Sequence, residues 1–193
     1  NNVRTVDYFL KQNDSVYLSL APSFISDFKE YSESQLLNAL HELGFAAVSE
    51  TALGAEYLSA ELRVWLDKQQ NGVHISTCCP TVVELIQKYY PQHIDTLTPF
   101  ASPLQIHARL IKRIYPDAKV VFAGPCIAKK TELNYPDNNI NLVLSFQELD
   151  ELLQSSGLQP EFIKADKAEF FEPFEAHNGK PFPVYGGMLY PIK

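Results

Sequence analysis

The sequence predicts an α/β fold in which mostly parallel strands alternate with flanking helices, arranged as two lobes. Short runs rich in β-branched residues recur between segments of helical periodicity, the pattern of βαβ units. Apolar residues make up 46% of the 193 residues, enough to form a sizeable core. We place the first lobe at about 1–105 and the second at about 106–193.

The first lobe is expected to contain three strands and three helices. Ser32 and Gln35 form a capping-box pattern at the start of the first helix, and Gly44 ends it. Pro80 suits the first turn of the third helix. The expected strands are 16–21, 45–48 and 73–76, and the expected helices are 32–43, 55–69 and 81–90.

The second lobe is expected to contain two strands and two helices. Pro103 and Pro116 bracket a helix, and Ser145 with Glu148 predicts a second capping box. The strands are expected at 119–122 and 140–144, and the helices at 103–115 and 145–155. The last segment, 170–193, is rich in Phe, Pro and Gly and is expected to be irregular.

Charge and hydropathy exclude several classes of partner. The net charge is −7 and the basic residues are scattered, so we expect no nucleic-acid surface. No apolar run is long enough for a membrane span, and no signal peptide opens the chain. Because the sequence also lacks an initiator Met, we expect a fragment of a longer cytoplasmic protein.

Three cysteines lie where expected strands end. Cys78 and Cys79 follow strand 73–76, and Cys126 follows strand 119–122. Ligands gather at the carboxyl ends of parallel strands, and a helix start favours the thiolate form. The two turns are therefore candidates to face one anionic, sulfur-bound cofactor, with Lys129 balancing its charge. Buried structural cysteines are the alternative interpretation. The spacing fits neither zinc nor thioredoxin-type motifs.

The two cysteine turns read Ser-Thr-Cys-Cys-Pro and Gly-Pro-Cys-Ile-Ala-Lys-Lys-Thr-Glu. These motifs resemble those of one family, the FeFe (iron-only) hydrogenases. Residues 76–80 (STCCP) resemble the family's first cluster-binding signature, and 124–132 (GPCIAKKTE) resemble the second. Tyr-Tyr-Pro at 89–91 and Ser-Pro-Leu-Gln at 102–105 match elements between them. The resemblance covers nearly the whole chain and is closest to a sensory branch of the family.

The resemblance implies an iron hydrogenase-like fold and specific site residues. Cys79 and Cys126 would be thiolate ligands of a 4Fe-4S cluster. Cys78 would carry protons to the di-iron subsite of the H-cluster, and Lys129 would hydrogen-bond a cyanide ligand there. Glu132 would hold Lys129 or its loop in place. A further residue, Thr98, lies where the family's proton path often uses a serine hydroxyl.

The sequence also departs from the family. A third signature, which supplies two further cysteines, is absent, so three cysteines cannot give a cubane four thiolates. We therefore expect this fragment by itself to be without its cluster. Thr81 and Val82 stand where the hydrogenases tend to carry Trp. A gapless alignment puts Leu62 and Trp65 where the hydrogenases have two glutamates, which removes carboxyls from the proton path.

Three functions remain open. The full-length protein could interconvert protons, electrons and dihydrogen, or it could be a non-catalytic iron–sulfur sensor of redox state or hydrogen. The third possibility is an interaction module without metal. The expected partners are a ferredoxin-like electron-transfer segment or protein and, in the sensory case, PAS or other signalling modules.

Overall fold

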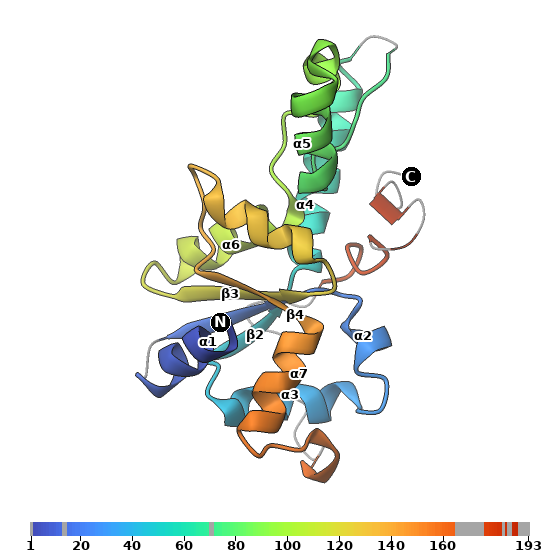
Figure 1. Cartoon of the computed structure of the whole chain (residues 1–193). Coiled ribbons are helices and arrows are strands. Elements are labelled where there is room, and N and C mark those ends of the chain that lie inside the picture. Colours follow the sequence, from blue (N-terminus) through green and yellow to red (C-terminus); the bar gives the residue numbers. More distant parts are fainter. Residues whose placement is uncertain are drawn as a thin grey trace.

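The computed structural model describes residues 2–12, 15–69, 72–164, 176–182, 184 and 187–188. Its centre is one parallel sheet of four strands in the order β2-β1-β3-β4, with helices on both faces (Figure 1). The α/β class with parallel strands is thereby confirmed. The strands are β1 (Val16–Leu20), β2 (Ala47–Glu50), β3 (Lys119–Gly124) and β4 (Leu142–Ser145).

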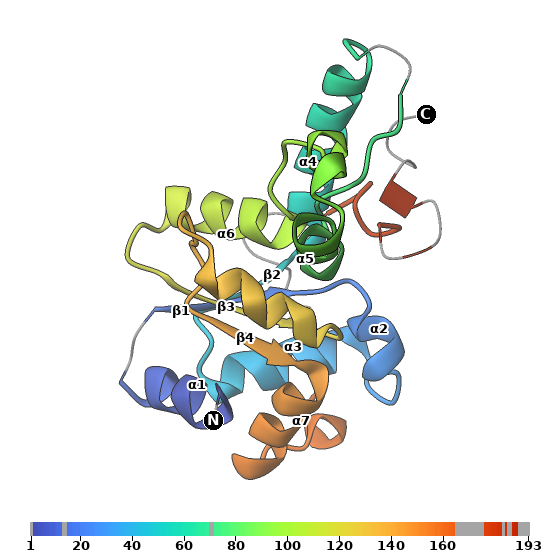
Figure 2. The ribbon, with the colours of Figure 1, turned by 45° about the horizontal axis from the view of Figure 1, so that its top comes forward.

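The helices form one layer on each side of the sheet. Helices α1, α3 and α7 pack on one face, and α6 packs on the other with α4 against it (Figures 1 and 2). The α-helices are α1 (Asn2–Lys11), α2 (Phe24–Asp27), α3 (Glu33–Leu43), α4 (Ala52–Leu66), α5 (Pro80–Tyr89), α6 (Pro103–Ile114) and α7 (Phe146–Ser155). The 3-10 helices are η1 (Pro91–Thr96), η2 (Ile127–Asn134) and η3 (Pro160–Phe162).

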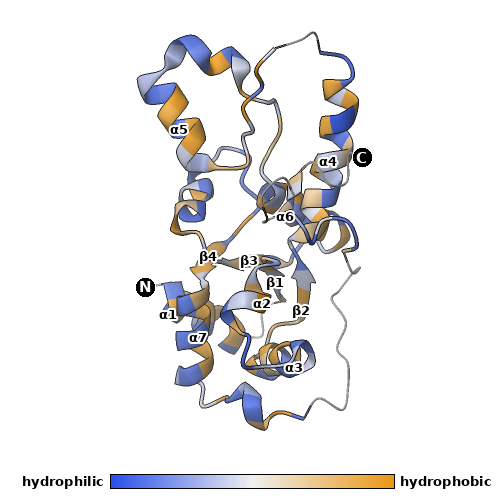
Figure 3. Cartoon of the chain, turned by 90° about the vertical axis from the view of Figure 1, so that its right-hand side faces the viewer, coloured by the Kyte–Doolittle hydropathy of each residue, from blue (hydrophilic) through white to orange (hydrophobic). Residues whose placement is uncertain are grey.

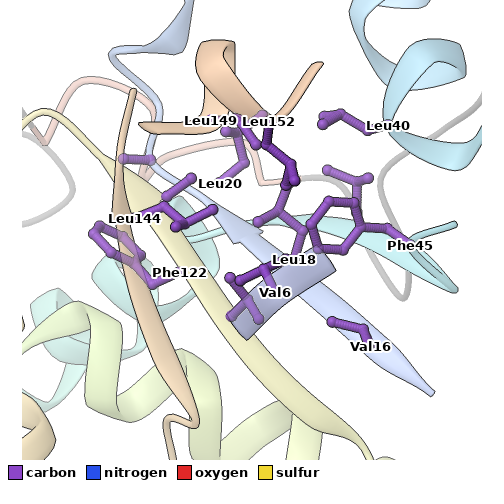
Figure 4. Close-up of a cluster of buried hydrophobic side chains, with 14 of the residues drawn as sticks. Val6, Val16, Leu18, Leu20, Leu40, Phe45, Phe122, Leu144, Leu149 and Leu152 are labelled. Atoms are coloured by element: carbon purple, nitrogen blue, oxygen red, sulfur yellow. The ribbon is translucent and has the colours of Figure 1, made fainter. Parts of the chain in front are cut away.

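The hydrophobic core lies mainly between the sheet and the layer of α1, α3 and α7. Leu18 and Leu20 of β1 and Leu144 of β4 are fully buried, and they face Leu149 and Leu152 of α7 (Figure 4). Burying such a side chain contributes roughly 1.5–3 kcal/mol. The strand residues on this face therefore hold the sheet rigid beneath the loops that leave its edge.

Both predicted capping boxes are present. The hydroxyl of Ser32 accepts from the backbone N–H of Gln35 at 3.2 Å, and the Gln35 side chain accepts from the N–H of Ser32 at 2.9 Å. Ser145 and Glu148 make the same reciprocal pair at the start of α7, at 3.1 and 2.8 Å. The short-range predictions of helix starts are confirmed because both partners lie within one turn.

The strand expected at 73–76 is wrong. Ile75 forms only a single parallel bridge with Leu97, and Val73 is 74% exposed. This bridge lies outside the four-stranded sheet, so residues 73–76 do not belong to it. The strand expected at 45–48 lies two residues later, because the N–H of Phe45 bonds to the Leu40 carbonyl at the end of α3. Helices α1 and η2 were not predicted from the sequence.

Strands from both sides of residue 105 belong to the same sheet, since β1 pairs with both β2 and β3. The boundary predicted near residue 105 therefore does not divide this sheet. The division of the chain into two lobes stays a prediction. Helices α4 and α5 both extend above the sheet and lie apart from each other (Figure 3). Most of the segment expected to be irregular, including residues 170–175 and 189–193, lies outside the described residues.

Candidate functional site

A pocket of about 190 Å³ opens at the carboxyl edge of the sheet. Residues that follow three strands line it: Ala21 after β1, Thr51 after β2 and Cys126 two residues after β3. The strand order reverses between β1 and β3, which is where open parallel sheets bind ligands. Ser23, Cys78 and Lys129 add further polar residues to the lining. The remaining walls are apolar and come from Pro22, Ala52, Ala55, Pro103, Leu104, Phe122, Pro125 and Phe182.

The turn that carries Cys126 leaves the sheet directly. It follows β3, and Cys126 is the N-cap of η2 with an exposed side chain. The last residue of β3 is a glycine, because a Cβ at Gly124 would lie 2.5 Å from the ring of Phe122. The thiol therefore stands at a helix start beside the pocket, in the setting expected from the sequence.

The turn that carries Cys78 and Cys79 is held in another way. Cys79 is the N-cap of α5 and is exposed, and Pro80 occupies the first helical position. The hydroxyl of Thr77 donates to the carbonyl of Phe100 at 2.6 Å. The hydroxyl of Thr98 lies 3.1 Å from the Thr77 hydroxyl and accepts from the Thr77 N–H at 3.2 Å. Side-chain hydrogen bonds therefore replace a strand as the support of this turn.

Lys129 joins the two turns. Its ammonium donates to the backbone carbonyl of Cys78 at 2.7 Å and to the Glu132 carboxylate at 2.5 Å. Glu132 is 1% exposed, and its second oxygen accepts from the Ser102 hydroxyl at 2.6 Å. The amide of Gln105 donates to the Glu132 carbonyl at 3.2 Å. The buried charge pair is thus both neutralised and hydrogen-bonded, as a buried pair needs to be.

The Cys78 thiol is chemically distinct from the other two. Burial raises the pKa of Cys78 above its ordinary value, and the hydrogen bond with Ser76 and the charge of Lys129 offset only part of this effect. Cys78 is therefore a protonated thiol at neutral pH. A neutral thiol can donate a proton, whereas a metal ligand is a thiolate.

The structure places four of the five expected site residues at one pocket, and Cys79 is not among the residues that line it. Cys78, Cys126 and Lys129 line the same pocket, and Glu132 binds Lys129. Helix α5, which begins next to Cys79, packs against η2, which begins next to Cys126. Among the described residues, however, no three His, Cys, Asp or Glu side chains are grouped closely enough to hold a metal ion. The Thr98 hydroxyl forms its hydrogen bonds with Thr77. Among the described residues, it forms none with Cys78.

Sequence reasoning missed the part that Ser102 and Gln105 play. Their Ser-Pro-x-Gln motif was visible, but its contact with Glu132 depends on residues about 30 positions apart. Glu56 was missed as well. Its carboxylate accepts from the backbone N–H groups of His177 and Gly179 at 2.5 and 2.9 Å, next to the segment whose Phe182 lines the pocket. No local signal in the sequence announces this long-range contact.

Residues 14–193 match the family described as "Iron only hydrogenase large subunit, C-terminal domain". The chain belongs to this iron-only hydrogenase family. The curated relatives include Iron hydrogenase 1 of Clostridium pasteurianum, 28% identical over 91% of this chain and 34% of that protein. The NADP-reducing hydrogenase subunit HndD of Solidesulfovibrio fructosivorans is 27% identical over 78% of the chain and 30% of its own length. This member thus spans about a third of these hydrogenases.

Solved hydrogenase structures have the same fold. A variant of the [FeFe]-hydrogenase HydA1 from Chlamydomonas reinhardtii superimposes with a TM-score of 0.75 at 19% identity, covering 88% of this chain and 51% of that one. The HydA(deltaEFG) structure, whose subject is stepwise H-cluster assembly, gives a TM-score of 0.74 at 20% identity. In the described part of this hydrogenase-family chain, no helix is both long and apolar enough to cross a bilayer.

Proposed function

We propose that this chain supplies Cys79 and Cys126 as two thiolate ligands of a 4Fe-4S cluster in a longer hydrogenase-like protein. The observation that carries the proposal is the link made by Lys129, which ties the two cysteine turns to each other at the carboxyl edge of the sheet. Both thiols are exposed, and each belongs to the N-cap residue of a helix, so a cluster can reach them.

The residues fit half of such a cluster. A cubane takes four cysteine ligands, whereas the chain has three cysteines, and one of them, Cys78, is a half-buried neutral thiol. Any further ligands would therefore come from outside these 193 residues. This requirement agrees with the chain covering about half of the hydrogenase structures that it matches.

The remaining site residues suit hydrogen chemistry. When bound, a 4Fe-4S cluster with a di-iron subsite supplies the electrons and the metal centre for interconverting protons and dihydrogen. Cys78 would hold the proton at its Sγ atom in the pocket. Lys129 would balance negative charge there, and Glu132 keeps that ammonium in place. The apolar walls, among them Leu104 and Phe122, would exclude water.

The second candidate function is an iron–sulfur sensor of redox state or hydrogen. It is favoured by the position of Thr98, whose hydroxyl is engaged with Thr77 rather than relaying protons to Cys78. In either case we propose a cytoplasmic protein with a ferredoxin-like electron partner, and the sensor would add PAS or other signalling modules.

The test is the iron content of full-length protein after anaerobic reconstitution. Cys79→Ser and Cys126→Ser should each lower both the iron per chain and the brown absorbance. Cys78→Ser is the matched control, because it should keep the cubane iron and lower only hydrogen turnover. Iron that is unchanged in both ligand variants would contradict the proposal. Absent turnover in wild-type protein with verified di-iron insertion would select the sensor.

A further inference from the structure

Two adjacent lysines after Cys126 point to different partners. Lys129 binds the Cys78 carbonyl and Glu132, whereas the ammonium of Lys130 donates to Glu148 at 2.7 Å. Glu148 belongs to the first turn of α7, so the second contact crosses from η2 to another element. The turn is therefore held from two sides by two consecutive side chains.

The sheet register explains why these two elements meet. Strands β3 and β4 are parallel neighbours, and Gly124 at the end of β3 pairs with Ser145 at the end of β4. The turn of Cys126 and the start of α7 consequently leave the same edge side by side. Helix η2 also packs on β4. The Lys130–Glu148 ion pair thus joins η2 and α7, which the pairing of β3 with β4 has already placed side by side.

Glu148 is a fixed anion rather than a free surface carboxylate. One of its oxygens accepts from the backbone N–H of Ser145 at 2.8 Å, and the other accepts from Lys130. Burial raises the pKa of Glu148, but these hydrogen bonds and the Lys130 charge outweigh it and hold the pKa below its ordinary value. Because the helix cap already fixes the Glu148 carboxylate, its pairing with Lys130 costs little further side-chain entropy.

We propose that Lys130 and Glu148 are a positioning pair that fixes the Cys126 turn for cluster binding. The inference rests on the proposed function of Cys126. Neither side chain touches the pocket, so both act through the turn they hold. Outer partners of this kind orient a metal ligand and so affect how firmly the metal is retained.

The chain contains a matched comparison. Lys88 and Glu84 form an ion pair at 2.6 Å, but they lie one turn apart on α5 and their side chains are 63% and 43% exposed. Lys130 and Glu148 are 31% and 24% exposed and are separated by 18 residues. An exposed pair within one helix contributes little. Only the second pair joins two elements beside a cysteine turn.

Two variants break the pair without removing the helix cap. Glu148→Gln keeps an acceptor for the Ser145 N–H, as Gln35 already does in the capping box of α3. Lys130→Met keeps the aliphatic stem and removes the ammonium. Both should leave the urea midpoint of unfolding close to that of the wild type. Both should accelerate amide hydrogen exchange within residues 126–134, whereas the control Lys88→Met should not.

Cluster retention is the second readout, measured as the rate at which a chelator removes iron from reconstituted full-length protein. Outer-shell substitutions weaken metal binding by about 10–100-fold, and this pair acts one step further out, so we expect release to be up to roughly tenfold faster. Lys130→Arg should restore slow release.

Unchanged exchange in both variants, or faster exchange without faster release, would overturn the positioning role. Equal effects of Lys88→Met would overturn it too. A wild-type protein that takes up no iron would instead refute the proposed function. In that case the exchange measurement would still decide whether the pair holds the turn.

Discussion

The two cysteine turns have nearly the same backbone but different supports. Cys79 has φ −105° and ψ 111°, and Cys126 has φ −104° and ψ 111°, each as the N-cap of the helix that follows. Cys126 continues from β3, an inner strand paired on both sides. Cys79 follows a segment with one isolated bridge, at Ile75, and a hydroxyl network around Thr77.

This contrast separates the local conformation of a ligand from its placement. Both cysteines are N-cap residues, which usually have extended backbone angles, although Pro80 follows Cys79 and Ile127 follows Cys126. The sheet then places one turn, whereas side-chain hydrogen bonds and Lys129 place the other. The supports should consequently fail under different perturbations, and three measurements can test this.

The largest effect should come from acid, which should lower the free energy of unfolding by protonating a histidine buried between α6 and the sheet. His107 of α6 is 1% exposed and lies 2.7 Å from the Ser19 hydroxyl of β1 and 3.0 Å from the Ser49 hydroxyl of β2. Burial lowers the pKa of His107 from 6.5 to about 3. The unfolded chain therefore binds a proton that the folded chain excludes. Stability should fall by about 1.4 kcal/mol for each pH unit below 6.5 until the folded pKa is reached.

Urea unfolding from pH 7 to pH 4 measures this loss. His107→Gln should be less stable at pH 7 but should lose less on acidification, because the titrating group is gone. His41→Gln, in the last turn of α3, is the control for loss of an imidazole and should follow the wild type. Equal slopes for His107→Gln and wild type would show that the imidazole is not the acid-sensitive group.

The next effect should come from cutting the link between the turns. Lys129→Met leaves the carboxylate of Glu132 buried without its cation, which typically costs about 3–5 kcal/mol. Adding Glu132→Gln should recover part of the loss, since a neutral amide still accepts from Ser102. The free energy of unfolding of the single and double variants gives the coupling. A double variant as unstable as the sum of both changes would mean that the pair is not coupled.

The smallest effect should be confined to the first turn. Thr98→Val removes the acceptor for the Thr77 N–H and should cost about 1 kcal/mol. Amide exchange should accelerate at residues 75–79 and stay unchanged at 126–134. Thr96→Val is the control, because its hydroxyl donates only to the exposed local carbonyl of His93. Equal acceleration in both segments would show that the two turns share one support.

Much of the fold was predictable because its signals are local. Both capping boxes, strand β1 and the proline-bounded helix α6 were predicted from residues within a turn or two of each other. The prediction for segment 73–76 failed because a strand needs a partner along its length, and Ile75 has only a single bridge, to Leu97. The cysteines and Lys129 were found through motif spacing, whereas Ser102 and Glu56 were not assigned roles because their partners are distant in the chain.

By itself the sequence determined the chemistry at each turn: a thiol at a helix start, two lysines after Cys126 and a carboxylate three residues after Lys129. It also determined membership of the hydrogenase family, since the motifs and their order are written in the chain. Only the tertiary structure decided that Lys129 bonds to Cys78, that Lys130 turns to Glu148, and that one sheet spans both halves. Those contacts depend on strand pairing between distant segments, which no local pattern encodes.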